Sequence, residues 1–208
     1  MAHLQATIFL PLVLGWDGTG NIYWSVDASF AVHHDMKSHT GGVMSLGTGA
    51  LIAMSTKQKL NTTSSTEAEL VGVGDSMAFN MWATYFFKEQ GRDLKDYKYG
   101  NRNILYQDNE SCIKLANNGK ASSSKRTRHI HIRYFFITDR VKRKEVEIQY
   151  CPTEEMISDY FTKPVQGGLF KKFRNSILGI TDDDFSRYKH EYENAKAKKT
   201  ATTESNSG

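Results

Sequence analysis

The chain has 208 residues, of which 39% are hydrophobic, and a formal net charge of +4. This fits one domain with a real core, and the charge is too small to indicate a nucleic-acid binder by itself. Cys112 and Cys151 lie too far apart for a metal motif and are expected to be free thiols in a reducing compartment. No apolar run is long enough to span a bilayer, and no signal-peptide pattern is present, so an intracellular, cytoplasmic protein is expected.

Residues 1–20 show little periodicity and are expected to form a lead-in segment, in which one short strand can lie around 8–14. A strand rich in β-forming residues is predicted over 22–29. Two further strands are predicted over 41–46 and 50–55, with a glycine-rich hairpin turn at 47–49 between them. These three strands are expected to be antiparallel.

A long helix is predicted over 65–90, where Gly91 can terminate it. Its apolar residues recur at helical spacing and are expected to face the core. They are Leu70, Val73, Met77, Met81, Trp82, Tyr85 and Phe86. A strand over 104–108 and a short helix over 109–117 follow a polar linker. A strand reached through a helix usually pairs in parallel, so this strand is expected beside the first one.

The last third of the chain begins with a basic, serine-rich loop at 119–128. A helix over 129–142, a strand over 145–150, a helix over 154–162 and an amphipathic helix over 170–178 are predicted after it. The polar composition beyond residue 180 predicts a tail, disordered from residue 189 onward. The expected divisions are therefore the lead-in 1–20, a domain over 21–180 and the tail 181–208.

Several acids are placed to converge in such a fold. Asp27 and Asp108 end two strands expected to be neighbours, Glu67 and Glu69 begin the long helix, and Asp159 lies near the start of a later helix. Acids this close repel one another, so a cluster makes sense mainly around a multivalent cation. All-oxygen ligands suit Mg²⁺ or Mn²⁺ rather than zinc. Taken singly, each acid also fits a turn or a helix cap.

Five motifs in order resemble the ribonuclease H domain of copia-type retrotransposon polyproteins. They are the segments 26–29, 64–70, 106–109, 125–137 and 158–164. The resemblance runs over about residues 22–178. It implies the ribonuclease H-like fold, an α/β arrangement with a five-stranded mixed sheet flanked by helices. It also implies an endonuclease that uses two Mg²⁺ ions, with Mn²⁺ as a substitute, to hydrolyse the RNA strand of RNA–DNA hybrids during reverse transcription.

The family's four carboxylates fall on Asp27, Glu69, Asp108 and Asp159. Glu69 is preferred to Glu67 because the family's helix acid is followed by an apolar residue, here Leu70. The resemblance is incomplete in one place, since cellular enzymes carry a histidine between the last strand and last helix. Here the loop 151–155 has none. The candidates for its role are His129, His131, Glu154 and a bulk water.

Basic residues in and after the loop 119–128 are expected to contact phosphates of the nucleic acid. They are Lys120, Lys125, Arg126, Arg128 and Arg133. A solvated polar loop explains the charge about equally well. The expected partners are the RNA–DNA hybrid and a reverse transcriptase domain of the same polyprotein. Two other functions fit the same fold: a silent nucleic-acid-binding remnant, and a nuclease that acts on DNA.

Overall fold

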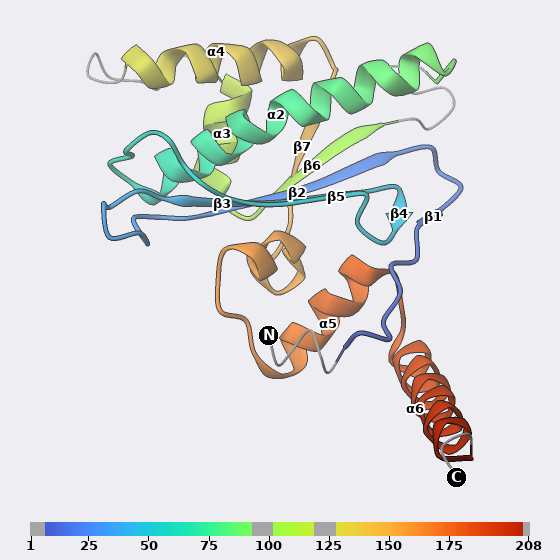
Figure 1. The fold of residues 1–208 in the computed structure, drawn as a ribbon. Helices are drawn as coiled ribbons and strands as arrows, with labels where there is room; N and C mark the ends of the chain where they lie inside the picture. The colour runs from blue at the N-terminus through green and yellow to red at the C-terminus, as the bar shows by residue number, and fades with distance from the viewer. Residues whose placement is uncertain (1–6, 93–101, 119–127, 206–208) are drawn as a thin grey trace.

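A mixed β-sheet with helices on both faces forms the body of the molecule (Figure 1). The structure, a computed structural model, describes residues 7–92, 102–118 and 128–205. Its strands are β1 (Gly15–Trp16), β2 (Ile22–Ser29), β3 (His39–Ser45), β4 (Gly47–Thr48), β5 (Ile52–Lys57), β6 (Asn103–Gln107) and β7 (Glu147–Tyr150). Its α-helices are α2 (Ser65–Glu89), α3 (Glu110–Asn118), α4 (Arg128–Lys142), α5 (Gly167–Leu178) and α6 (Asp182–Ser205), and its 3₁₀ helices are η3 (Thr153–Glu155) and η4 (Ile157–Phe161).

The main sheet has the strand order β5-β3-β2-β6-β7. β2 pairs antiparallel with β3 and parallel with β6, and β7 continues the parallel half beside β6. This confirms the predicted fold class, including the central place of β2 between β3 and β6. The helices α2, α3 and α4 lie on one side of the sheet, and η3, η4 and α5 lie on the other (Figure 1). β2 is therefore covered on both faces, and seven of its eight residues are buried.

Helix α2 forms as predicted because both of its ends are capped. The Ser64 side chain accepts a hydrogen bond from the Glu67 N–H, and Gly91 follows the helix with φ +79°. Leu70, Val73 and the two methionines of the predicted stripe are buried in the core with Trp24, Leu105 and Ile137. The last part of the stripe is wrong, since Trp82, Tyr85 and Phe86 are about half exposed. The helix turns them away from the sheet, and Trp82 stacks on Phe86 instead. On α4, Tyr134 is buried, whereas the next two residues, Phe135 and Phe136, are exposed.

The two ends of this stripe should differ in their effect on stability. Met77 is fully buried, whereas Trp82 is 60% exposed. Met77→Ala is expected to lower the free energy of unfolding by about 2–5 kcal/mol, because it leaves a cavity in the core. Trp82→Ala is expected to cost less than about 1.5 kcal/mol, the worth of one exposed ring stack. Urea denaturation of both variants would measure this, and equal losses would contradict the assigned core.

The lead-in segment does not contain the expected strand at 8–14. Val13 instead donates its N–H to the Leu178 carbonyl at the end of α5, and the chain becomes a strand only at β1. β1 pairs with β4, which occupies the predicted hairpin turn. The turn between β3 and β5 is thus longer than predicted because part of it joins this second, two-stranded sheet.

The predicted helix over 154–162 is wrong in type. Two 3₁₀ helices occupy the segment, and Met156 between them has an extended backbone with ψ 90°. Met156 is fully buried, so packing of its side chain accounts for the break. Helix α5 begins at Gly167 rather than residue 170, and β7 begins at Glu147 rather than residue 145.

The predicted disordered tail is also wrong over its described part, where Asp182–Ser205 forms α6. Thr181 and Asp184 exchange hydrogen bonds as a capping box at its start. Phe185 packs edge-on against Phe9 and lies under the Arg174 guanidinium. Tyr192, two turns further along, also contacts Phe9. Beyond these contacts the helix points away from the domain (Figure 1), and its alanine, lysine and glutamate residues favour helix by intrinsic propensity. The proposed division at residues 20 and 180 stays a prediction. No helix among the described residues has the length and apolarity needed to cross a bilayer.

Candidate active site

Three carboxylates from separate elements meet at one edge of the sheet. Asp27 lies in β2, Glu69 in α2 and Asp108 directly after β6, and one oxygen of each lies within 4.8 Å of the others. Asp27 and Glu69 are buried and Asp108 is half-buried. β2 and β6 are parallel neighbours, so their carboxyl ends bring Asp27 and Asp108 together.

The two acids at the start of α2 have different surroundings. Glu67 is bonded through Oε2 to the N–H and hydroxyl of Thr63, both at 2.7 Å, and so completes the helix cap. Glu69 lies beyond the first turn, not within it as expected, and faces the acid cluster. The geometry therefore favours Glu69 over Glu67 as a metal ligand.

Asp159 approaches this cluster from η4, on the other face of the sheet from α2, but it is not among the three acids whose oxygens lie within 4.8 Å of one another. It is buried and accepts a hydrogen bond from Lys163 Nζ at 2.8 Å, while the same ammonium lies 3.3 Å from Asp27 Oδ1. Gly41, the neighbour of Asp27 in β3, makes this approach possible. A Cβ atom at Gly41 would lie only 2.6 Å from the Ser158 carbonyl oxygen, so a larger residue would push η4 away.

The cluster carries a high electrostatic cost without a cation. Burial, together with the charges of Asp27 and Asp108, raises the pKa of Glu69 to about 9. Burial and the charge of Asp27 raise the pKa of Asp159 to about 6, against the opposing hydrogen bond from Lys163. Carboxyls that resist ionisation in this way are stabilised as anions by a bound cation.

Neutral side chains hold three of the acids in place. Gln107 donates to Glu69 Oε2 at 3.2 Å, Thr153 donates to Asp108 Oδ2 at 3.0 Å, and the Thr162 hydroxyl donates to Asp27. Sequence reasoning missed all three, and also missed Lys163. Their place in the sequence could have indicated a role for three of these residues. Gln107, Thr162 and Lys163 lie inside the motifs that carry the family resemblance.

Loss of Gln107 should therefore weaken metal binding. Gln107 is fully buried and its amide also reaches the Val26 carbonyl, so the side chain is fixed where it orients Glu69. Gln107→Leu is expected to lower Mg²⁺ affinity about 10–100-fold, as is usual for partners that orient ligands. Gln149→Leu is the matched control, because the Gln149 side chain donates to Glu147 in β7 and lies outside the acid cluster. Titration calorimetry with both variants measures the effect, and equal affinities would refute the orienting role.

The basic residues expected to contact nucleic acid are only partly described. Lys120, Lys125 and Arg126 lie outside the described residues, as does the side chain of Arg128. Arg133 is described, and its guanidinium forms an ion pair with Asp75 of α2. Phosphate contact by these five residues stays a prediction.

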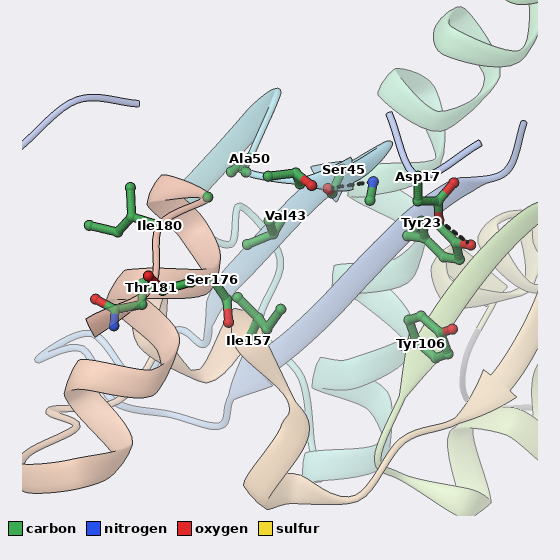
Figure 2. Close-up of a pocket in the computed structure, with 15 residues that line it drawn as sticks. Asp17, Tyr23, Val43, Ser45, Ala50, Tyr106, Ile157, Ser176, Ile180 and Thr181 are labelled. Atoms are coloured by element: carbon green, nitrogen blue, oxygen red, sulfur yellow. Dashed lines mark hydrogen bonds between the residues drawn. The ribbon is translucent and has the colours of Figure 1, made fainter. Parts of the chain in front are cut away.

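A separate cavity of about 560 Å³ lies on the η4 and α5 side of the sheet. Figure 2 shows Tyr23 and Tyr106 along one wall and Ile157, Ser176 and Thr181 opposite. Tyr23 lies near the start of β2 whereas Asp27 lies near its end, so the cavity is distinct from the acid cluster. Asp17 is its acidic residue, and Asp17 is bonded to Tyr23 and Thr19.

The strand order and the acids gathered at the ends of β2 and β6 define a domain of the ribonuclease H-like class. In sequence the chain is related to the retrovirus-related Pol polyproteins of transposons, in agreement with the family inferred from its motifs.

Two plant polyproteins illustrate the relationship. The chain is 30% identical over 135 residues to the Pol polyprotein from transposon TNT 1-94 of Nicotiana tabacum, covering 65% of this chain and 10% of that one. It is 30% identical over 182 residues to that from transposon RE1 of Arabidopsis thaliana, covering 87% and 12%. The chain thus spans about a tenth of the length of these relatives.

Among solved structures, the chain is similar to LC11-RNase H1, isolated from compost. The sequence identity is 13% and the TM-score 0.43, over 68% of this chain and 92% of that one. No protein-family model matches the chain.

Proposed function

We propose that the chain is a divalent-metal-dependent endonuclease that hydrolyses the RNA strand of RNA–DNA hybrids during retrotransposon reverse transcription. The observation that carries the proposal is the meeting of Asp27, Glu69 and Asp108 within 4.8 Å, from three elements far apart in the sequence. Relationship to Pol polyproteins supplies the context in which such hybrids arise.

The residues present fit Mg²⁺, with Mn²⁺ as a substitute. Among the residues that the structure describes, the donors in the cluster are all carboxylates and include no histidine or cysteine, and hard divalent cations prefer oxygen. Asp27, Glu69 and Asp108 would hold a first ion, and Asp159 would join Asp27 or Asp108 in holding a second. When bound, such ions activate a water and stabilise the leaving oxygen in phosphodiester cleavage.

The protein's own contribution is to hold the acids and the substrate. Gln107, Thr153 and Thr162 fix the carboxylates so that little reorganisation is needed when the site is loaded. The five basic residues from Lys120 to Arg133 would bind backbone phosphates. A hybrid is gripped through groove shape and 2′-hydroxyls, which distinguish its RNA strand from DNA. The reverse transcriptase part of a Pol polyprotein is the expected protein partner.

The test is cleavage of end-labelled duplexes of one sequence, prepared as RNA–DNA hybrid, double-stranded RNA and double-stranded DNA. With Mg²⁺ the RNA strand of the hybrid should be cut, both homoduplexes should stay intact, and a chelator should stop the reaction. Cleavage of DNA instead would identify a DNA-acting nuclease. Binding of hybrid without cleavage under Mg²⁺ or Mn²⁺ would identify a silent remnant.

A further inference from the structure

The ammonium group of Lys163 lies among the acids of the site. Its Nζ is 2.8 Å from Asp159 Oδ1 and 3.3 Å from Asp27 Oδ1, so one cation joins a carboxylate of the sheet strand β2 to a carboxylate of η4. Asp27 and Asp159 are both buried, with 1% and 5% of their side chains exposed. The proposed reaction has no role for this lysine, although it contacts two of the four proposed ligands.

The backbone holds Lys163 at this place. Its N–H donates to the Asp159 carbonyl at 2.9 Å at the end of η4, and Pro164 follows it directly. The neighbouring Thr162 hydroxyl donates to Asp27. The side chain itself is 40% exposed, so the ammonium can leave the carboxylates toward solvent without unfolding the segment.

A divalent cation and this ammonium need the same oxygens. A carboxylate oxygen that accepts a hydrogen bond from Nζ gives up part of its electron density for coordination, and the two positive charges repel over a few ångströms in a partly buried site. Loading of a cation through Asp27 and Asp159 is therefore opposed while Nζ stays in place.

We propose that Lys163 is a positioning residue that neutralises Asp27 and Asp159 in the metal-free domain and is displaced when a divalent cation binds them. Lys163 thus sets the affinity of the ion that depends on Asp159. The inference rests on the proposed function only in taking the acid cluster as a divalent-cation site.

The first test measures Mn²⁺ binding in the absence of nucleic acid, using the electron paramagnetic resonance signal of free Mn²⁺ as the readout. Lys163→Met should bind the weaker of the Mn²⁺ ions at least about tenfold more tightly than wild type, because a competing charge is gone. Lys114→Met is the matched control, since it removes the same charge and a Lys–Glu pair outside the cluster. Equal Mn²⁺ binding by the two variants would overturn the proposal.

A second test uses the wild-type chain and so does not depend on the folding of a variant. Acetylation of lysines by a limiting reagent, read by mass spectrometry, should become several-fold faster at Lys163 when Mn²⁺ is added and stay unchanged at Lys114. An unchanged ratio of the two rates would refute the displacement. Neither readout requires cleavage, so the two proposals can fail separately. A hybrid that is not cut would count against the proposed function alone. A hybrid that is cut, together with an acetylation rate of Lys163 that Mn²⁺ does not change, would count against this inference alone.

Discussion

Asp108→Asn is expected to bind RNA–DNA hybrid with near wild-type affinity and to cut it at least about a thousandfold more slowly. The variant keeps the shape of the side chain and the oxygen that can accept the Thr153 hydrogen bond, but it removes one negative charge from the cluster. A bound cation stabilises the transition state by several kcal/mol, and the loss of that stabilisation accounts for a decrease in the cleavage rate of this size. Single-turnover cleavage and filter binding measure the two quantities separately.

The matched control is Glu110→Gln, which makes the same chemical change two residues further on. Glu110 is exposed, pairs with Lys114 and lies outside the cluster. Its variant should cut at the wild-type rate. Equal activity of Asp108→Asn and wild type would show that the metal-site assignment is wrong.

The metal-free chain is expected to lose stability as the pH rises from about 4.5 to about 9, because the pKa of Glu69 is raised from 4.5 to about 9 in the fold. Below pH 4.5 this carboxyl is protonated in both the folded and the unfolded chain. Across the window the unfolded chain has released a proton that the folded chain retains, so the free energy of unfolding falls by at most about 1.4 kcal/mol per pH unit. Above the window the dependence ends.

Urea denaturation between pH 6 and pH 9, with chelator, tests this expectation where Asp159, with a pKa of about 6, adds little further change. Glu69→Gln should flatten the slope, and saturating Mg²⁺ should do the same in wild type because the bound ion keeps Glu69 ionised. A wild-type slope equal to that of Glu69→Gln would mean that Glu69 is not buried among other acids.

The sheet and α2 could be predicted because local signals agree with the tertiary structure there. β2 is rich in β-forming residues, and Ser64 and Gly91 mark the ends of α2. Where packing decides, prediction failed. Trp82 fits the helical stripe yet faces away from the sheet, although its neighbours Met81 and Ala83 are buried, and Met156 breaks the helix expected around Asp159 by packing into the core.

The candidate site, too, could be predicted from the sequence only in part. Asp27 and Asp108 could be brought together from the ends of two strands, because parallel pairing puts those ends at one edge. The choice of Glu69 over Glu67 depended on a resemblance, and the different hydrogen bonds of the two acids agree with it. Lys163 could not be assigned, since its contact with Asp27 spans 136 positions and requires the approach of η4 over Gly41.

Anomalous diffraction from a crystal of the chain grown with Mn²⁺ tests the shared cation site most directly. We expect a peak coordinated at once by oxygens of Asp27, Glu69 and Asp108. A crystal in which these three side chains point to different surfaces, or in which Mn²⁺ binds elsewhere and leaves them empty, would contradict it.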